Sequence, residues 1–227
     1  MNTFAIADTH FDHEGIMRHC RRPWIRQGDL FTEGEHFGEF IDRAVAKARV
    51  EEMNVGMIDN WNSVVTGKDT VIIVGDFAFK RHMHFLGALK GKKILIKGNH
   101  DDMSQEEYRN FTEVYDMRMF SLPKGKKGFF CHYCMQSWPN SGRGVYHFYG
   151  HSHGRIREQD GYLRCDVGVD VWNYTPVPVE ILVEKMEMRG ASGRHPFIGE
   201  GDRSVAENRT YNMALLNKVK TQKEIAQ

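Results

Sequence analysis

The sequence predicts an α/β fold built in layers, and three observations support that prediction. Short apolar runs rich in β-branched and aromatic residues alternate along the chain with segments of helical periodicity. The 227 residues are enough to bury a sizeable core. Hydrophobic residues make up 41% of the chain and charged residues 27%, which are ordinary values for a globular domain. We therefore expect one folded domain of moderate size.

Seven segments are expected to form strands, because each combines a short apolar run with β-branched or aromatic residues. The first three are predicted to be buried strands. In chain order, the seven segments are residues 3–7, 70–74, 93–97, 128–132, 145–149, 162–169 and 179–184.

Four segments are expected to form helices. Residues 37–48 and 57–65 lie between the first two strands, and each places its apolar side chains on one helical face. Shorter helices are expected at residues 80–89 and 104–111. The second of these is predicted to begin at Ser104, with Glu107 completing a capping box.

The composition of the chain changes near residue 189, where glycine and polar residues become frequent. We expect a core domain over residues 1–188 and an extension over residues 189–227, either mobile or docked as one helix.

Composition and charge also exclude several classes of protein. No stretch approaches the roughly 18–20 apolar residues that a membrane helix needs, and the first residues do not resemble a secretory signal. Lys and Arg total 31 against 30 Asp and Glu, so the near-neutral charge gives no strong nucleic-acid footprint. Four cysteines are too few for a disulfide scaffold and are typical of a cytoplasmic protein. Oligomeric state stays open.

Residues that can ligate a metal follow five of the predicted strands. In layered α/β folds, functional sites are built where strands end. The five strand ends carry Asp8 and His10, then Asp76, then Asn99, His100 and Asp101, then His132, and finally His151 and His153.

The donor set predicts a centre with two metal ions. Asp8 and His10 are two residues apart, so in an extended chain their side chains point to the same side. Seven O and N donors exceed the needs of one ion, and a shared carboxylate would join two. Imidazole with carboxylate suits Mn²⁺, Fe, Zn²⁺ or Ni²⁺ better than Ca²⁺ or a single Mg²⁺. We expect two divalent ions, Mn²⁺ first, with Fe, Zn²⁺, Ni²⁺ and Mg²⁺ as alternatives.

In this order, the five blocks resemble the signature of the calcineurin-like metallophosphoesterases. That signature reads Asp-x-His, Gly-Asp, Gly-Asn-His-Asp or -Glu, His, and Gly-His-x-His. Residues 166–177 resemble the closing segment of small stand-alone bacterial and phage members. The resemblance implies a four-layer αββα sandwich of two mixed sheets flanked by helices. It further implies that residues 11–69 fold over the site as a partial lid within a catalytic domain of residues 1–188.

The resemblance also implies a role for each residue of the signature. His100 would be the catalytic histidine, which stabilises the phosphoryl group or protonates the leaving oxygen, and Asp101 would orient His100. The first metal would be held by Asp8, His10 and His153, the second by Asn99, His132 and His151, and Asp76 would bridge the two.

The function expected from these roles is hydrolysis of phosphodiester bonds in nucleotide-like or other small phosphate substrates, by attack of a metal-bridging hydroxide. Two ions about 3.5–4 Å apart can activate water and clamp phosphate oxygens. Protein phosphatases of this superfamily follow Gly-Asp with an acidic residue and Arg, whereas Asp76 is followed by Phe77 and Ala78, so that class is disfavoured.

Several alternatives stay open. A phosphomonoesterase or nucleotide phosphatase is the first, and a non-catalytic metal-stabilised scaffold is less expected.

An arginine is expected to bind the substrate phosphate, because a guanidinium can bind a phosphate group in a bidentate way. Residues 131–134 form a Cys-x-x-Cys pattern, for which inert thiols are favoured over a redox or zinc role. The arginines considered are Arg18, Arg22 and Arg155.

Overall fold

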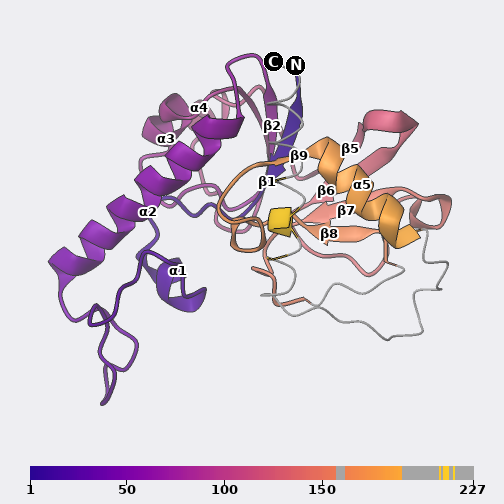
Figure 1. The fold of residues 1–227 in the computed structure, drawn as a ribbon. Coiled ribbons are helices and arrows are strands. Elements are labelled where there is room, and N and C mark those ends of the chain that lie inside the picture. Colours follow the sequence, from indigo (N-terminus) through magenta and orange to yellow (C-terminus); the bar gives the residue numbers. More distant parts are fainter. Residues whose placement is uncertain (157–161, 191–209, 211, 215–216, 218–227) are drawn as a thin grey trace.

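Two mixed β-sheets pack against each other and carry helices on the outside (Figure 1). The computed structural model describes residues 1–156, 162–190, 210, 212–214 and 217. The first sheet has the order β4-β3-β2-β1-β9, and its neighbours are parallel except β1 with β9. Its strands are β1 (Thr3–Ile6), β2 (Thr70–Val74), β3 (Lys92–Ile96), β4 (Glu113–Tyr115) and β9 (Val177–Pro178).

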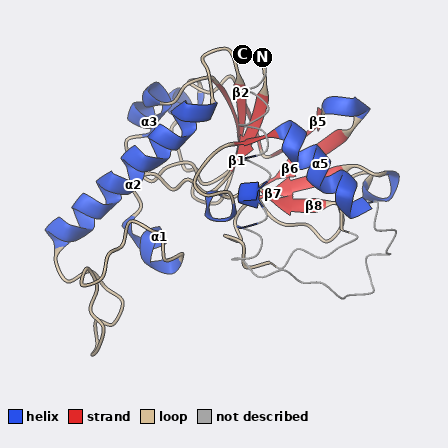
Figure 2. Cartoon of the chain, in the orientation of Figure 1, coloured by secondary structure: helices blue, strands red, loops and turns tan. Residues whose placement is uncertain are grey.

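The second sheet has the order β5-β6-β7-β8 and is also mixed (Figure 2). β5 runs antiparallel to β6, while β6 is parallel to β7 and β7 is parallel to β8. The strands are β5 (Met117–Ser121), β6 (Lys127–Cys131), β7 (Tyr146–Tyr149) and β8 (Arg164–Asp166).

Side chains of the first sheet alternate between two buried cores, as the two-residue period of a strand requires. In β1, Phe4 and Ile6 pack toward the helices on the outer face. Ala5, in contrast, joins the core between the sheets, where it shares a cluster with Phe130 and Phe148 of the second sheet. Both faces of β1 are therefore covered, which fixes the position of the residues that follow it.

Four of the described helices lie on the outer side of the first sheet, and a fifth packs against β1, β8 and β9. In the outer group, α2 buries Met53, Met57 and Trp61 in the same core as Phe4. The helices are α1 (Glu14–His19), α2 (Arg43–Val64), α3 (His82–Ala88), α4 (Gln105–Tyr108) and α5 (Val179–Gly190); the short 3-10 turns are η1 (Pro123–Gly125), η2 (Ser141–Arg143) and η3 (Val169–Val171).

The structure confirms the predicted α/β fold of two mixed sheets flanked by helices. It also confirms the capping box, because Ser104 and Glu107 bond each other's backbone N–H groups. The strand predicted at 179–184 is wrong, since these residues begin α5. Val179, Leu182, Val183 and Met186 are all buried, which is the spacing of a helical face.

The helix predicted at 37–48 is also wrong in its first half. Asp42 caps α2 by accepting a hydrogen bond from the Ala44 N–H, so the helix begins at Arg43. The preceding chain turns back on itself, and Leu30 pairs with Phe40 in an isolated bridge. The segment 57–65 is the continuation of the same helix rather than a second one.

Little of the predicted C-terminal extension belongs to the described residues. Arg189, its first residue, is part of α5. Asn212 is buried and donates from Nδ2 to the Val171 carbonyl at 2.7 Å, and the Lys185 ammonium donates to its Oδ1 at 2.8 Å. Residues 191–209, 211, 215–216 and 218–227 lie outside the described part. Among the described helices, none is long and apolar enough to cross a membrane.

Candidate metal centre

The site forms where the parallel strands of the first sheet end at one edge. The loops that follow β1 and β2 stay paired beyond the strands, because the Asp8 N–H donates to the Gly75 carbonyl at 3.0 Å. The His10 N–H donates to the Asp76 carbonyl at 2.9 Å. From the second sheet, the His151 N–H donates to Asp8 Oδ1 at 2.9 Å. These hydrogen bonds bring three distant parts of the sequence together.

The predicted ligands share an unusual backbone conformation. Positive φ angles are uncommon outside glycine and are best tolerated by Asn, Asp and His. Such strain gathers at functional sites, where the surroundings hold it in place. Five of the seven predicted ligands adopt it: Asp8 (58°), His10 (47°), Asp76 (55°), His151 (66°) and His153 (48°).

The first group of ligands comprises Asp8, His10 and His153, whose ligand atoms lie within 4.8 Å of one another. Two buried atoms of this group, Asp8 Oδ2 and His10 Nε2, have no hydrogen-bond partner among the described residues. A buried polar atom without a partner is costly, and a cation held between these atoms would satisfy both.

His153 is oriented by a carboxylate that lies outside the predicted ligand set. Its Nδ1 lies 2.7 Å from Asp170 Oδ2, which directs Nε2 away from Asp170. Arg22 in turn holds Asp170, with Nε 3.2 Å from Oδ1 and Nη2 3.2 Å from Oδ2. A histidine that gives its second nitrogen to a carboxylate is typical of metal ligands. The Cys20 thiol also comes within 4.8 Å of ligand atoms of His153 and Asp170.

The second group comprises Asp76, His132 and His151. His132 Nδ1 lies 2.8 Å from the Val74 carbonyl oxygen, which can only accept a hydrogen bond, so Nδ1 carries a proton. The Nε2 lone pair of the neutral ring then faces Asn99 Oδ1 at 3.1 Å and Asp76 Oδ2 at 3.4 Å. Three acceptors that converge in this way require a cation or a proton between them.

Asp76 lies between the two groups. Its Oδ2 is 3.4 Å from His10 Nε2 and 3.4 Å from His132 Nε2. Its other oxygen, Oδ1, accepts a hydrogen bond from the His100 N–H at 2.9 Å. A Cβ at Gly98 would lie only 2.3 Å from this Oδ1, so the close approach requires glycine there. One carboxylate oxygen thus faces ligands of both predicted metals.

The ionisation of the site in the absence of a cation is unusual. Burial raises the pKa of Asp8 to about 7, although the charges of His153 and His132 oppose this rise. Burial would also raise the pKa of Asp76, but the His132 hydrogen bond and charge hold it at about 2. Burial would lower the pKa of His132, yet the neighbouring Asp76 and Asp8 raise it to about 9. A proton on His132 thus supplies the positive charge that a bound cation would otherwise supply.

His100 lies at the exposed side of the centre. Its ring centroid is 5.5 Å from that of His10 and 5.0 Å from that of Phe79. Its side chain is exposed, as is that of Asn99. A bound molecule can therefore reach His100, as it can the exposed ligands Asn99 and His151.

Asp101 does not have the predicted contact with the His100 ring. Among the described residues, its carboxylate oxygens accept hydrogen bonds from three backbone N–H groups, those of Asp76, Phe77 and Gly98, at 2.8, 2.9 and 2.8 Å. Asp101 thereby joins the turns after β2 and β3. It acts on the bridging Asp76 and not on the ring of His100.

The arginines predicted to bind substrate lie in three different environments. Arg22 is 1% exposed, and its guanidinium also donates to the Asp8 and Thr9 carbonyls at 2.7 and 2.9 Å. Its predicted contact with substrate is therefore wrong, because its donors are already used inside the protein. Arg155 donates to the His19 carbonyl at 3.1 Å, and Arg18 lies 4.0 Å from Glu14. For these two, a substrate contact stays a prediction.

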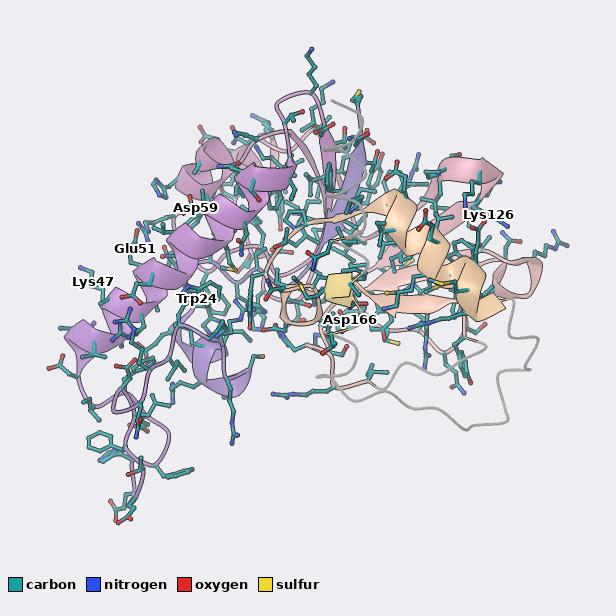
Figure 3. The ribbon with its side chains drawn as sticks, viewed as in Figure 1. Trp24, Lys47, Glu51, Asp59, Lys126 and Asp166 are labelled. Atoms are coloured by element: carbon teal, nitrogen blue, oxygen red, sulfur yellow. The ribbon has the colours of Figure 1, made fainter. Side chains whose placement is uncertain are left out.

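Two aspartates of the segment 166–177 support the site. Asp166 accepts hydrogen bonds from the Ser152 hydroxyl at 2.8 Å and from the Gly154 N–H at 2.9 Å. It lies toward the middle of the molecule, at the end of β8 (Figure 3). Asp166 thus fixes the loop that carries His151 and His153, while Asp170 orients His153. The Asp-Val-Gly-Val-Asp sequence of residues 166–170 is the signal that points to both.

The cysteines of residues 131–134 fit the expectation of inert thiols. Cys131 is buried, Cys134 is partly buried, and neither forms a disulfide. Burial raises the pKa of both thiols, which lowers their reactivity.

Comparisons with known proteins agree with the fold. No family model matches the sequence. An uncharacterized protein of Methanocaldococcus jannaschii is 28% identical over 194 residues, which cover 81% of this chain and 90% of that protein. The crystal structure of a protein of unknown function from Aquifex aeolicus superposes with a TM-score of 0.55 and 20% identity, covering 82% of this chain and 98% of that one.

Two further solved structures are less similar. A conserved uncharacterized protein from Streptococcus pneumoniae, described as a predicted phosphoesterase, has a TM-score of 0.37 and 12% identity over 74% of this chain and 70% of that one. Vps29 from Entamoeba histolytica, solved in complex with Zn²⁺, has a TM-score of 0.36 and 14% identity over 74% of each chain.

Proposed function

We propose that this protein is a dinuclear metal-dependent phosphoesterase that hydrolyses phosphodiester bonds in nucleotide-like or other small phosphate substrates. The observation that carries the proposal is the position of Asp76, whose Oδ2 is 3.4 Å from Nε2 of both His10 and His132. A single carboxylate oxygen between two groups of ligands suits a pair of ions, Mn²⁺ first, better than one ion.

The roles of the chain's own residues follow from their positions. Asp8, His10 and His153 would hold the first ion, and Asn99, His132 and His151 the second, with Asp76 shared. Divalent ions bound here would supply an activated water and electrostatic binding of the phosphate oxygens.

His100 supplies the proton transfer. Because its ring is exposed beside the buried ligands, it can contact the phosphoryl group or donate a proton to the leaving oxygen. Its backbone N–H is fixed by Asp76 Oδ1, so His100 and the bridging carboxylate keep a constant relative position. We place the catalytic domain at residues 1–188, and the cytoplasm remains the predicted compartment.

The test is hydrolysis of bis-p-nitrophenyl phosphate by the purified protein with and without Mn²⁺. Asp76→Asn and His100→Ala should each lower the rate by at least about 100-fold, the usual contribution of a catalytic group. Asp59→Asn and His36→Ala are matched controls, since both side chains are exposed and lie outside the centre. Activity that survives both site substitutions and metal removal would contradict the proposal.

A phosphomonoesterase is the alternative, because the site chemistry suits either ester. The ratio of the rates on bis-p-nitrophenyl phosphate and p-nitrophenyl phosphate separates the two. A metal-stabilised scaffold would bind the ions and hydrolyse neither substrate.

A further inference from the structure

Phe79 is an aromatic side chain held beside the metal centre without being part of the core. Its neighbour Phe77 and the nearby Phe11 are fully buried, whereas Phe79 is 38% exposed. Exposure of a single apolar residue is common and means little by itself. The place of this ring, directly beside the exposed histidine predicted to be catalytic, is what calls for an explanation.

The backbone of Phe79 is fixed by the same pairing that builds the site. Its N–H donates to the Phe11 carbonyl at 2.8 Å, next to the bridge between Phe11 and Ala78. The loops after β1 and β2 are therefore paired before the ligands His10 and Asp76, through Asp8 and Gly75, and again after them, through Phe11 and Phe79. The backbone of Phe79 cannot move away from the site without breaking this pairing.

Histidines surround the Phe79 ring. His13 stacks on it with a centroid distance of 3.7 Å and an interplanar angle of 15°. His13 Nδ1 is also 3.4 Å from His10 Nδ1, so the stack is attached to a predicted metal ligand. The His100 ring lies 5.0 Å from Phe79, inclined by 40°. One face of Phe79 is therefore covered by His13, and the ring stands next to His100.

In this position the Phe79 ring would contact the leaving group of a bound phosphate ester. If His100 protonates the leaving oxygen, the leaving group must lie beside His100. The surface that it then meets includes the rigid, apolar ring of Phe79. Flat aromatic groups gain more from contact with such a ring than aliphatic groups of similar size, because the π-systems can stack or meet edge to face.

We propose that Phe79 is a specificity-determining residue, which selects phosphate esters whose leaving group carries a planar aromatic ring, such as a nucleobase or an aryl group. This inference rests on the proposed phosphoesterase function, and it narrows the substrate class. His13 supports Phe79 from behind and is a positioning residue.

The test compares two ligands that differ in ring planarity but not in reaction chemistry, at a pH above the second pKa of both, so that both are dianions. Phenylphosphonate and cyclohexylphosphonate both have a stable carbon–phosphorus bond, so their binding can be measured by calorimetry on the Mn²⁺-loaded protein without hydrolysis. Wild type should bind phenylphosphonate about five- to tenfold more tightly, as expected for one aromatic contact.

Three variants complete the test. Phe79→Leu keeps an apolar side chain and should abolish the preference, while methylphosphonate affinity stays within about twofold. Phe79→Tyr keeps the aromatic ring and should retain the preference for phenylphosphonate. Phe31→Leu is the matched control, because Phe31 is a phenylalanine of nearly equal exposure, 39%, in the loop before α2.

Two results would overturn the inference: wild type without any preference for the planar ligand, or Phe79→Leu that weakens all three phosphonates equally. Failure of the proposed function looks different. In that case the wild-type protein hydrolyses no phosphate ester under any metal condition, while the planar preference and its dependence on Phe79 can still be measured.

Discussion

At the scale of single residues, Arg22 connects two parts of the first ligand group. Its guanidinium binds the Asp170 carboxylate, which orients His153, and it also binds the backbone carbonyl of Asp8. Both the arginine and the aspartate are buried. One side chain therefore positions two ligands of the first group, although it lies outside the ligand set itself.

Replacing Arg22 by methionine should lower both stability and metal affinity. Asp170 would lose its buried guanidinium partner, and breaking a buried ion pair costs about 3–5 kcal/mol in the free energy of unfolding. The loss of orientation at His153 should weaken metal binding about 10- to 100-fold. Urea denaturation and Mn²⁺ titration measure the two effects.

The control for this prediction is Arg26→Met. Arg26 pairs with Glu52 at the surface, where an ion pair contributes about 1 kcal/mol or less. If Arg22→Met and Arg26→Met had equal effects on both measurements, Arg22 would have no special role.

His147 should make the fold sensitive to acid. It is fully buried in the second sheet, where Nδ1 bonds the Phe129 carbonyl at 3.1 Å and Nε2 accepts from the Met135 N–H at 3.1 Å. Burial, with a smaller effect of the Arg164 charge, lowers its pKa to about 4. The Phe129 carbonyl opposes this shift, as does the Tyr133 carbonyl, to which Nε2 could donate at 3.2 Å only when the ring is protonated. The folded protein therefore keeps His147 neutral where the unfolded chain is already protonated.

Because the folded pKa is depressed, stability is lost as the pH falls from about 6.5 toward 4, by roughly 3 kcal/mol for the whole shift. His147→Gln should remove this part of the pH dependence. Urea denaturation of both proteins at pH 7.5 and pH 5 gives the comparison. Equal pH dependence in the two proteins would contradict the prediction.

At the scale of elements, α2 is held against the rest of the molecule by close contacts along one side. Asn54 bonds the Asp12 carboxylate with its Nδ2 at 2.8 Å, and Arg81 also binds Asp12. Two residues further on, Gly56 passes the indole of Trp24 so closely that a Cβ would lie 2.8 Å from its Cζ2 atom. The helix thus packs beside the loop that follows His10.

Two glycine substitutions in helices should have opposite effects. Gly56→Ala gains helix propensity, about 1 kcal/mol, but creates overlap with a packed indole, which typically costs about 1–3 kcal/mol, so we expect net destabilisation. Gly87→Ala in α3 has no atom near the added Cβ and should stabilise by up to about 1 kcal/mol. Thermal unfolding of both variants is the measurement. If both changes had the same sign, the Trp24 contact would not limit the size of residue 56.

The strand ends can be predicted from the sequence, whereas long-range partners cannot. Residues 70–74 form β2 with the predicted bounds, because a buried parallel strand is apolar throughout. The sequence does not predict β5, because its Met117 and Ser121 are exposed and leave no continuous apolar run. The β-branched Val179 and Val183 favour a strand where α5 forms, although packing places them on one helical face.

The same distinction applies to the site. Its ligands can be found in the sequence because they directly follow strands. Asp170 and Arg22 are harder to assign, since a separation of 148 residues is bridged only in the folded molecule. The contact between Arg22 and Asp170, which gives Arg22 a structural role, therefore cannot be predicted from local sequence patterns.

At the scale of the whole molecule, metal loading should couple stability to pH. In the metal-free protein the pKa of Asp8 is raised by burial to about 7, so its contribution to stability is present below the unfolded pKa near 4 and is lost as the pH rises through 7. Metal binding requires the carboxylate and a neutral His132, whose pKa is raised to about 9.

The stabilisation by Mn²⁺ should therefore grow between pH 6 and pH 9. At a free concentration of 100 times the dissociation constant it amounts to about 2.7 kcal/mol. Thermal unfolding with Mn²⁺ or with a chelator across this pH range measures the difference. A difference that is constant with pH would contradict the coupling.

The antiparallel pairing of β1 with β9 has a consequence for the way the protein is made. A ribosome releases the first strand long before it synthesises Val177, and the carboxylate that orients His153 also comes late in translation. A nascent chain that still lacks residues 170–178 has neither this edge strand nor the carboxylate that orients His153, so we expect the centre to form late in synthesis.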